Sequence, residues 1–436
     1  MEPALVDKSM DMSSPLETSQ ASHTEKRRSK GILTALISLA SVSFGVLSLA
    51  LTGNFANVGG TTFIIMLIFS SFLNYYSSSC LTFFAETHKL QTFTDFSKKI
   101  CHPSYHFVVD FAFFLMNFGG LIVPQVFLNN FTCQVAKQIT SIDLLINPAR
   151  YFWLIFFSVI GFPIVMIRRL KDVTFVTIFG FISMTGVLSL LLYWLVAHYD
   201  PSSAGPAVNR PPPTPKSFLT TFFYTIYALN YQENVIGIYD ELKDKSLRKM
   251  NKVYLIHSII FVSFFSFVAI SGNVLFRNHP DLLEEDVLTL FPPENIFVIF
   301  VKVLMIGTGF VSFTCTFKPF REILIDKVID FKRGHHVEHR DVEEEYSQEK
   351  TIVFLTTALA LFGVTITSAA LMSSKVNFID AIEYISSTIV PIVCIIIPVY
   401  VYSSSQKSIF AKIMFVFTCV MTFIQMLHTF GLGLPI

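Results

Sequence analysis

Residues Phe218–Lys252 read FLTTFFYTIYALNYQENVIGIYDELKDKSLRKMNK and carry the strongest signal in the chain. The stretch begins as an apolar run, is interrupted by polar residues from Leu229 to Asn234, and ends in a charged segment from Asp240 to Lys252. Polar side chains at bilayer depth are costly unless they face a cavity or a partner, and a broken membrane helix is tolerated only where its freed backbone lines protein or water. The sequence therefore predicts a membrane helix that is broken at a ligand site.

The composition is typical of a protein that crosses a membrane many times. Of its 436 residues, 52% are hydrophobic and only 14% are charged, whereas soluble domains contain about 25% charged residues. The sequence shows no basic surface with interleaved aromatic residues, so nucleic-acid binding is not indicated. The apolar runs long enough to span a bilayer predict an all-α protein with about eleven membrane helices, at residues 32–55, 62–84, 106–134, 151–167, 173–197, 217–239, 253–276, 294–317, 351–373, 378–402 and 409–432.

The distribution of Lys and Arg predicts the orientation. With the N-terminus in the cytosol, about 25 of the 32 basic residues fall in segments on the inner side, as the positive-inside rule requires. The polar, Ser/Thr-rich residues 1–30 are then a disordered cytosolic tail, and the charged residues 327–350 are a cytosolic loop. Residues 200–216, rich in Pro and Gly, are an extended outer linker.

The linker divides the chain into two halves with a similar layout. Residues 31–199 and 217–402 each contain five predicted spans, and 403–436 adds an eleventh. The first span, LTALISLASVSFGVLSLALTGN at 33–54, is rich in small residues at its centre. Irregular segments at corresponding positions of two halves indicate an inverted-repeat transporter, with free N–H groups for a carboxylate and free carbonyls for a cation. Small residues also line tight helix contacts, so this alternative stays open for the first span.

Several motifs resemble those of the amino acid/auxin permease family, which includes the sodium-coupled neutral amino acid transporters and the fungal vacuolar amino acid transporters. The sixth span carries IYDEL at 238–242 and RKM at 248–250, although Gly237 replaces the usual Pro and Gln232 the usual His. SFGVL at 43–47 is similar to the family's Gly-x-Gly-Ile-Leu break, and FKPFR at 317–321 to the end of its eighth span.

The resemblance implies a LeuT-like fold, ten spans in a 5+5 inverted repeat plus one C-terminal helix, and secondary transport of amino acids by alternating access. It implies that N–H groups near the break in the first span bind the α-carboxylate of the substrate, at Ser43, Phe44, Gly45 and Val46. It implies that carbonyls of the sixth-span break bind the α-amino group, at Tyr227, Ala228, Leu229 and Asn230.

Two coupling ions stay open, and no other cofactor is expected. In the sodium-coupled branch a hydroxyl of the eighth span helps to hold Na⁺, and the matching position is Ser312. That branch also carries an Asn where this chain has Leu39, so an oxygen ligand is missing. The competing ion is H⁺, with Glu233 as its carrier, because a carboxyl group away from water can titrate near neutral pH. Alternatively, Glu233 forms an ion pair with Lys302.

Other functions are less well supported. A sensor with the same fold, which binds an amino acid without net transport, is the main alternative. An enzyme is not expected, because the spans contain no HExxH or GxSxG motif and no paired carboxylates. We expect a multi-pass protein of the plasma membrane or of a vacuolar or lysosomal membrane.

Overall fold

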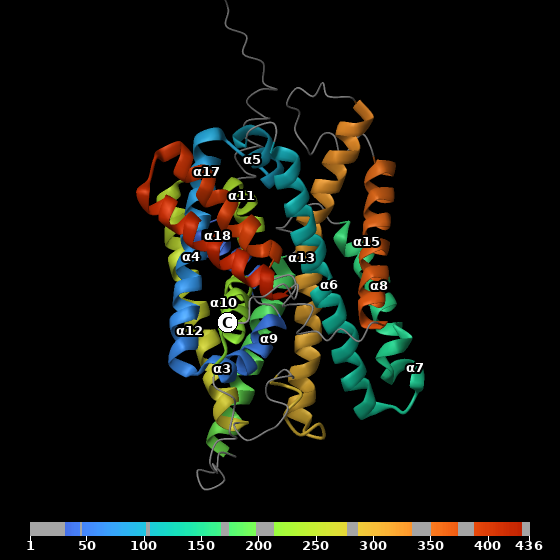
Figure 1. Ribbon diagram of the computed structural model, residues 1–436. Helices are drawn as coiled ribbons and strands as arrows, with labels where there is room; N and C mark the ends of the chain where they lie inside the picture. The colour runs from blue at the N-terminus through green and yellow to red at the C-terminus, as the bar shows by residue number, and fades with distance from the viewer. Residues whose placement is uncertain are drawn as a thin grey trace, which may run out of the picture.

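The computed structural model describes residues 31–43, 46–101, 105–166, 174–197, 213–276, 287–333, 350–373 and 388–429. All regular secondary structure in these ranges is helical, and the long helices run side by side (Figure 1). The predicted tail at 1–30, most of the linker at 200–216 and most of the loop at 327–350 lie outside the described residues.

Eight helices in the described ranges are long and apolar enough to cross a membrane, and each coincides with a predicted run. They are α4 (Gly60–His88), α6 (His106–Ile139), α9 (Thr174–Ala197), α12 (Leu247–Leu275), α13 (Ile296–Arg333), α15 (Lys350–Ser373), the run Thr388–Gln406 and α18 (Ile409–Thr429). A ninth apolar helix, α8 (Phe152–Val165), is shorter. The number of membrane crossings stays a prediction.

The two runs that the sequence singles out are divided into shorter helices. In the first, α2 (Ile32–Ser43) is followed by a 3₁₀ helix, η1 (Val46–Ala50), and by α3 (Leu51–Val58); a 3₁₀ stretch within a longer helix often marks a functional hinge. In the other, α10 (Pro215–Ala228) and α11 (Gln232–Asp240) are separated by Leu229–Tyr231. The break is shorter than the predicted 229–234, because Gln232, Glu233 and Asn234 form the first turn of α11.

Short elements complete the described chain. Helix α5 (Phe93–Ile100) begins with a capping box between Thr92 and Asp95, and α7 (Asp143–Ile146) and η2 (Pro148–Arg150) precede α8. A π-helix, η5 (Ile392–Ile396), leads into α17 (Ile397–Gln406). The hydroxyl of Ser77 donates a hydrogen bond to the carbonyl of Cys394 within this π-helix, so α4 satisfies one backbone group at a place where the α-helical ladder is interrupted.

Two groups of helices lie side by side in Figure 1. We call α2, η1, α3, α4, α10, α11 and α12 the α4 group, because α4 and α12 pack against the others. We call α6, α8, α13 and α15 the α6 group, in which α6 packs against the other three. Helix α9 contacts both groups, through α13 on one side and α12 and α2 on the other.

Buried polar side chains join the helices within each group. In the α6 group, Gln125 donates to Ser158 and Thr365 and accepts from Ser368, so α6, α8 and α15 share one network. In the α4 group, Ser70 bonds Thr225 at 2.7 Å and Thr82 bonds Tyr254 at 2.6 Å, and Asn54 accepts from Thr221. Each of these hydrogen bonds lies within one group.

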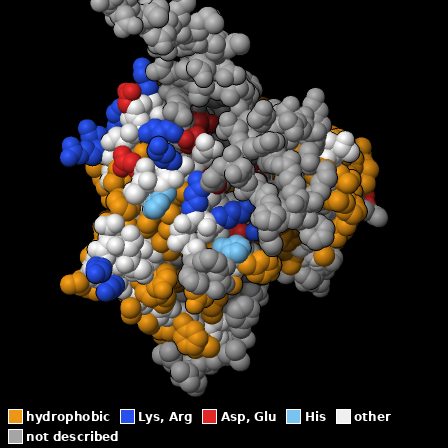
Figure 2. All heavy atoms as spheres, turned by 90° about the horizontal axis from the view of Figure 1, so that it is seen from above, with side chains coloured by type: hydrophobic (Ala, Val, Ile, Leu, Met, Phe, Trp, Pro, Cys, Tyr) orange, Lys and Arg blue, Asp and Glu red, His pale blue; other side chains and the backbone are white. Residues whose placement is uncertain are grey.

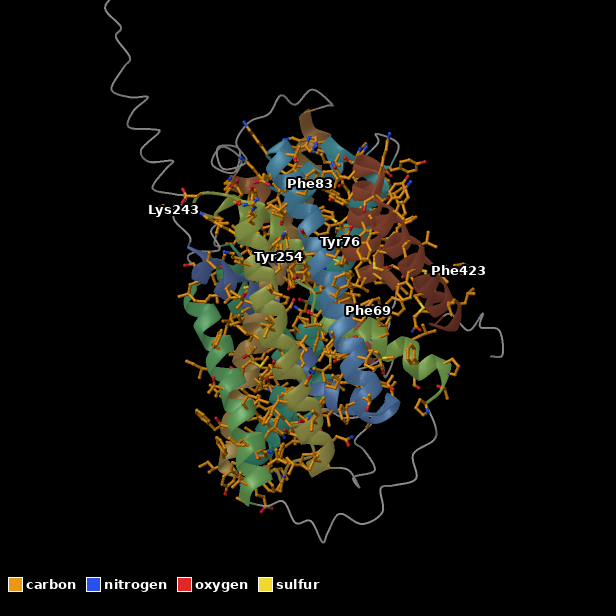
Figure 3. All side chains as sticks on the ribbon, turned by 90° about the vertical axis from the view of Figure 1, so that its left-hand side faces the viewer. Phe69, Tyr76, Phe83, Lys243, Tyr254 and Phe423 are labelled. Carbon is orange, nitrogen blue, oxygen red and sulfur yellow. The ribbon has the colours of Figure 1, made fainter. Side chains whose placement is uncertain are left out.

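An aromatic seam attaches the last two helices to α4. Phe69, Tyr76 and Phe83 recur at seven-residue intervals, which places them on one face of α4 (Figure 3). Tyr402 of α17 lies 6.4 Å from Tyr76 and 5.4 Å from Phe83, and Phe417 of α18 lies 5.5 Å from Phe69, as ring centroids. The C-terminal helices therefore pack on this face of α4, while η5, which leads into α17, also contacts α6.

The described ends of the helices carry many basic residues at one end of the molecule (Figure 2). Figure 2 shows Lys and Arg side chains gathered at one end of the molecule. The exposed basic residues of the described loops and helix ends include Lys89, Lys98, Lys99, Lys243, Arg248 and Lys407. Asp110 and Lys327 pair at 2.5 Å between α6 and α13. Helix α13 continues to Arg333, so the predicted loop 327–350 begins later than expected.

We predict that Gly272→Ala destabilises the protein, because α12 approaches α3 closely at this residue. A Cβ at Gly272 would lie 2.5 Å from Oγ1 of Thr52 and 2.8 Å from a methyl group of Val287, and overpacking typically costs about 1–3 kcal/mol. Thermal unfolding in detergent should show a clear loss for this variant. The control is Gly363→Ala, where a Cβ meets no atom within 4 Å; equal stability of the two variants would contradict the packing argument.

Candidate functional site

A cavity of about 50 Å³ lies between the two groups of helices, where both interrupted helices meet α6 and α13. Six lining residues come from the α4 group: Ser43, Leu47, Tyr227, Ala228, Asn230 and Glu233. Six come from the α6 group: Met116, Gly120, Val123, Pro124, Ser312 and Thr316. A buried water needs roughly 10–15 Å³ of cavity volume, so the cavity has room for about four waters. A larger ligand requires that the walls move apart.

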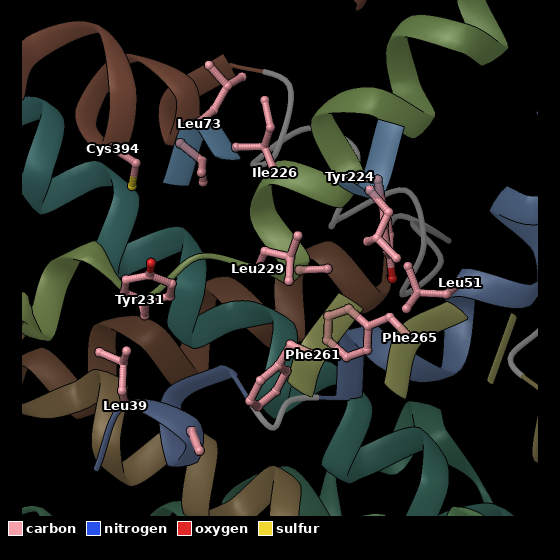
Figure 4. Close-up of a cluster of buried hydrophobic side chains, with 14 of the residues drawn as sticks. Leu39, Leu51, Leu73, Tyr224, Ile226, Leu229, Tyr231, Phe261, Phe265 and Cys394 are labelled. Atoms are coloured by element: carbon pink, nitrogen blue, oxygen red, sulfur yellow. The ribbon is translucent and has the colours of Figure 1, made fainter. Parts of the chain in front are cut away.

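Most of the site residues predicted from the sequence meet at this cavity. Of the ten, six line it: Ser43, Tyr227, Ala228, Asn230, Glu233 and Ser312. Phe44 and Gly45 lie outside the described residues, and Val46 is the first residue of η1. The side chain of Leu229 packs in the buried apolar core instead (Figure 4), so only its backbone is available to a ligand.

Asn74 of α4 holds the break between α10 and α11. Its amide nitrogen donates to the carbonyl of Ile226 at 3.1 Å, and its amide oxygen accepts from Gln232 at 2.5 Å. The side-chain oxygens of Asn230 and Gln232 in turn accept from the backbone N–H groups of Gln232 and Tyr231. Because backbone groups freed in a membrane helix must find partners, this network allows the break to exist.

Glu233 places a carboxyl group against the cavity. It lies in the first turn of α11, where the positive end of the helix dipole favours an anion. Asn234 donates to it at 3.4 Å, and the Tyr227 hydroxyl and Cys394 thiol are the titratable groups that interact with it. No ion pair joins Glu233 to Lys302 in the described chain; the Lys302 ammonium group lies 5.8 Å from the ring centroid of Phe131. The alternative of a Glu233–Lys302 pair is therefore wrong.

The α6 group contributes neutral oxygen atoms to the cavity. Ser312 and Thr316 are one helical turn apart on α13 and present two hydroxyl groups. On α6, Pro124 has no N–H group, so the carbonyl of Gly120, four residues earlier, lacks its usual helical donor. Leu39 is fully buried in α2 and is not among the lining residues. The cavity thus offers several acceptors for a cation or an ammonium group.

Two residues near the site were missed by the sequence analysis. Asn74 lies in the span 62–84 and His257 in the span 253–276, and both are almost completely buried. Polar or ionisable residues within membrane helices are functional candidates by default; this signal was present in the sequence, but it did not indicate which partners the two side chains meet. The structure shows that Asn74 contacts the break before α11 and that His257 contacts Ser43.

The sequence model of one family, described as "Transmembrane amino acid transporter protein", matches residues 28–433. The chain belongs to this transmembrane amino acid transporter family. The predicted membership in the amino acid/auxin permease family is thereby confirmed, and the family and fold point to a transporter rather than an enzyme. A sequence comparison with the curated proteins found no match.

Two solved transporter structures have a similar fold. One is a Na⁺-coupled sialic acid symporter in a substrate-bound outward-open state, with a TM-score of 0.55 and 11% identity, covering 92% of this chain and 90% of the symporter. The other is Mhp1, a nucleobase-cation-symport-1 family transporter in a closed conformation with bromovinylhydantoin bound, with a TM-score of 0.57 and 11% identity, covering 93% and 92%. The predicted LeuT-like fold is confirmed, and identities this low show the fold alone.

We predict that Asn74 and Gln232 are energetically coupled. Replacing Gln232 by Ala leaves the amide oxygen of Asn74 without its donor, and replacing Asn74 by Ala leaves the amide nitrogen of Gln232 without that acceptor. Replacing both removes the pair together, so the double variant should lose less stability than the sum of the two single variants. Contacting polar residues typically show coupling of about 0.5–3 kcal/mol. Unfolding in mixed detergent micelles measures the cycle. Asn74→Ala combined with Thr185→Ala on α9 is the control, and additive losses for the Asn74–Gln232 pair would contradict the network.

Proposed function

We propose that the protein is a secondary active transporter that moves amino acids across a membrane by alternating access, as an H⁺ or Na⁺ symporter. The observation that carries the proposal is the cavity between the α4 group and the α6 group, to which both interrupted helices contribute. In transporters built from repeats, the substrate and ion sites lie at the repeat interface beside discontinuous helices. The cavity of this protein lies at the corresponding position, beside its interrupted helices, which supports a substrate site in the cavity.

The pattern of hydrogen bonds supports movement of one group against the other. Polar networks join the helices within each group, such as Gln125 with Ser158 and Thr365 in the α6 group and Ser70 with Thr225 in the α4 group. Apolar contacts have no fixed direction and can be exchanged as surfaces slide. The cavity is too small for most amino acids as it stands, so opening between the groups is a requirement of the proposal.

The polarity of the walls supports one orientation of the substrate. An α-carboxylate is expected at the end of α2 and the start of η1, near Ser43, Phe44, Gly45 and Val46, where N–H groups at a helix start favour an anion. An α-ammonium group is expected at the carbonyls of Tyr227, Ala228, Leu229 and Asn230, at the negative end of α10. Glu233 beside these carbonyls adds to the preference for a cation.

The coupling ion is proposed to be H⁺, carried by Glu233. Among the lining residues Glu233 alone carries a formal charge when ionised near neutral pH, and it has no cationic partner in the described chain. Loading a proton would remove a charge from the cavity before the walls close over it, which lowers the cost of burying the site. Na⁺ bound by Ser312 and neighbouring carbonyls is the competing proposal.

The experiment that tests the function is uptake of labelled L-alanine and labelled L-arginine into proteoliposomes. We expect accumulation driven by an inward proton gradient, and sodium gradients of equal size serve as the second arm. Accumulation with sodium alone would overturn proton coupling but keep the transporter. Saturable binding without accumulation under either gradient would overturn transport and favour the amino acid sensor.

We predict that Glu233→Gln removes the pH dependence of uptake. In the parent protein one pH unit should change uptake by up to about tenfold, because that is the largest change in the protonated fraction of a single carboxyl group. Gln keeps the shape and the acceptor of Glu233 but cannot titrate, so the profile should become flat. The matched control is Glu294→Gln, at an exposed carboxyl group outside the cavity. A parent-like profile in Glu233→Gln would remove Glu233 from this role.

We predict that Ser312→Ala leaves proton-driven uptake within about twofold of the parent, because a neutral hydroxyl–water contact contributes little net free energy. If Na⁺ is the coupling ion instead, the same substitution removes an oxygen ligand and should raise the sodium concentration needed for half-maximal uptake about tenfold. Sodium titrations of uptake by the parent and by Ser312→Ala separate the two outcomes, with Thr314→Ala on the same helix as the control.

A further inference from the structure

His257 of α12 connects the two interrupted helices. Its side chain is almost completely buried, and Nε2 lies 2.9 Å from Oγ of Ser43, the last residue of α2. The imidazole ring stacks on Phe261 at 4.2 Å and meets the edge of Tyr231 at 4.6 Å, as ring centroids. Tyr231 belongs to the break between α10 and α11. One imidazole is thus held by an aromatic ring on each of two sides and by a hydroxyl at the edge of the cavity.

The hydrogen bonds of His257 indicate which nitrogen carries the proton. Nδ1 has no hydrogen-bond partner among the described residues, and the ring contacts Ser43, Tyr231 and Phe261, none of which carries a carboxylate. A proton on Nδ1 would leave a buried N–H donor without an acceptor, which proteins avoid more strictly than an unfilled acceptor. The charged imidazolium ring and the neutral Nδ1–H tautomer would both bury an Nδ1–H group that has no acceptor. The neutral Nε2–H tautomer does not, and its N–H group donates to Ser43.

This bond determines what Ser43 can offer to the cavity. A hydroxyl group has one hydrogen to donate and two lone pairs to accept with. The Ser43 oxygen accepts from His257, and Ser43 makes no other side-chain hydrogen bond within the described chain. Its own hydrogen is therefore left to donate, and Ser43 lines the cavity. Without His257, the Ser43 hydroxyl could rotate and accept a hydrogen bond from the cavity side. An anion needs a hydrogen-bond donor, so this orientation would not stabilise it.

We infer that His257 is a positioning residue that fixes the Ser43 hydroxyl as a hydrogen-bond donor to the carboxylate of the substrate, so that the site selects substrates that carry a carboxylate. The inference rests on the proposed function, in which the end of α2 meets the α-carboxylate. It adds His257 of α12, a residue that does not itself line the cavity. Hydrogen bonds to an ionised acceptor are roughly twice as strong as neutral ones, so the arrangement favours a carboxylate over a neutral amide.

The test compares inhibition of uptake by L-alanine and by L-alaninamide, which lacks the negative charge. The parent should prefer alanine. His257→Phe keeps an aromatic ring between Tyr231 and Phe261 but has no donor, and the preference for alanine should fall about fivefold. His257→Gln should restore the preference, because its amide nitrogen reaches the position of Nε2. His257→Asn should not, because its shorter amide group lies near the position of Nδ1.

Ser43→Ala provides a second route if His257→Phe does not fold, which thermal unfolding in detergent reports. It should reduce the preference for alanine to the same extent, and combining it with a folded His257 variant should cause no further loss. An equal loss for alanine and alaninamide in His257→Phe would overturn the inference and indicate a purely structural role. A parent that neither transports nor binds alanine overturns the proposed function, whereas a parent that prefers alanine and a His257→Phe variant with the same preference overturn the inference alone.

Discussion

The structure depends on one constraint, which is that every backbone group freed within the membrane must find a partner inside the protein. Two helices are interrupted, and each interruption removes ladder hydrogen bonds. Asn74 supplies a donor to the carbonyl of Ile226 at the end of α10, and Tyr224 donates to the carbonyl of Leu47 in η1. The breaks therefore depend on the polar residues of the α4 group, which satisfy the freed backbone groups. The polar site in turn depends on the breaks.

This constraint also explains why the cavity lies between the two groups of helices. Within the α4 group, the Ser70–Thr225 bond joins the broken helix α10 to α4, and the His257–Ser43 bond joins α2 to α12. Within the α6 group, the network around Gln125 fixes α6 to α8 and α15. Polar side chains from both groups line the cavity between them, among them Ser43 and Glu233 on one side and Ser312 and Thr316 on the other. A ligand that supplies polar partners to both walls would stabilise the closed arrangement.

The electrostatics of the cavity separate its two ends. The end of α2 presents the Ser43 hydroxyl, backed by His257, while the break before α11 presents carbonyls and the carboxyl group of Glu233. Under the proposed function, a zwitterion suits these walls better than an ion of either sign, because the hydroxyl can donate to its carboxylate and the carbonyls and Glu233 can accept from its ammonium group. The protonation of Glu233 changes the net charge of the cavity, since no cation balances its charge among the described residues.

The sequence by itself determined the helices and the position of the interruptions, because apolar runs of membrane length and polar residues within them are local signals. It also predicted six of the lining residues, among them Ser43, Glu233 and Ser312, because the resemblance carries the positions of the breaks. It left open a pair between Glu233 and Lys302, and in the structure the Lys302 ammonium group lies near the ring of Phe131 instead. It did not find the partners of Asn74 and His257, or that the side chain of Leu229 packs in the core. Those depend on which faces of helices distant in sequence meet, and only the packing of the two groups decided that.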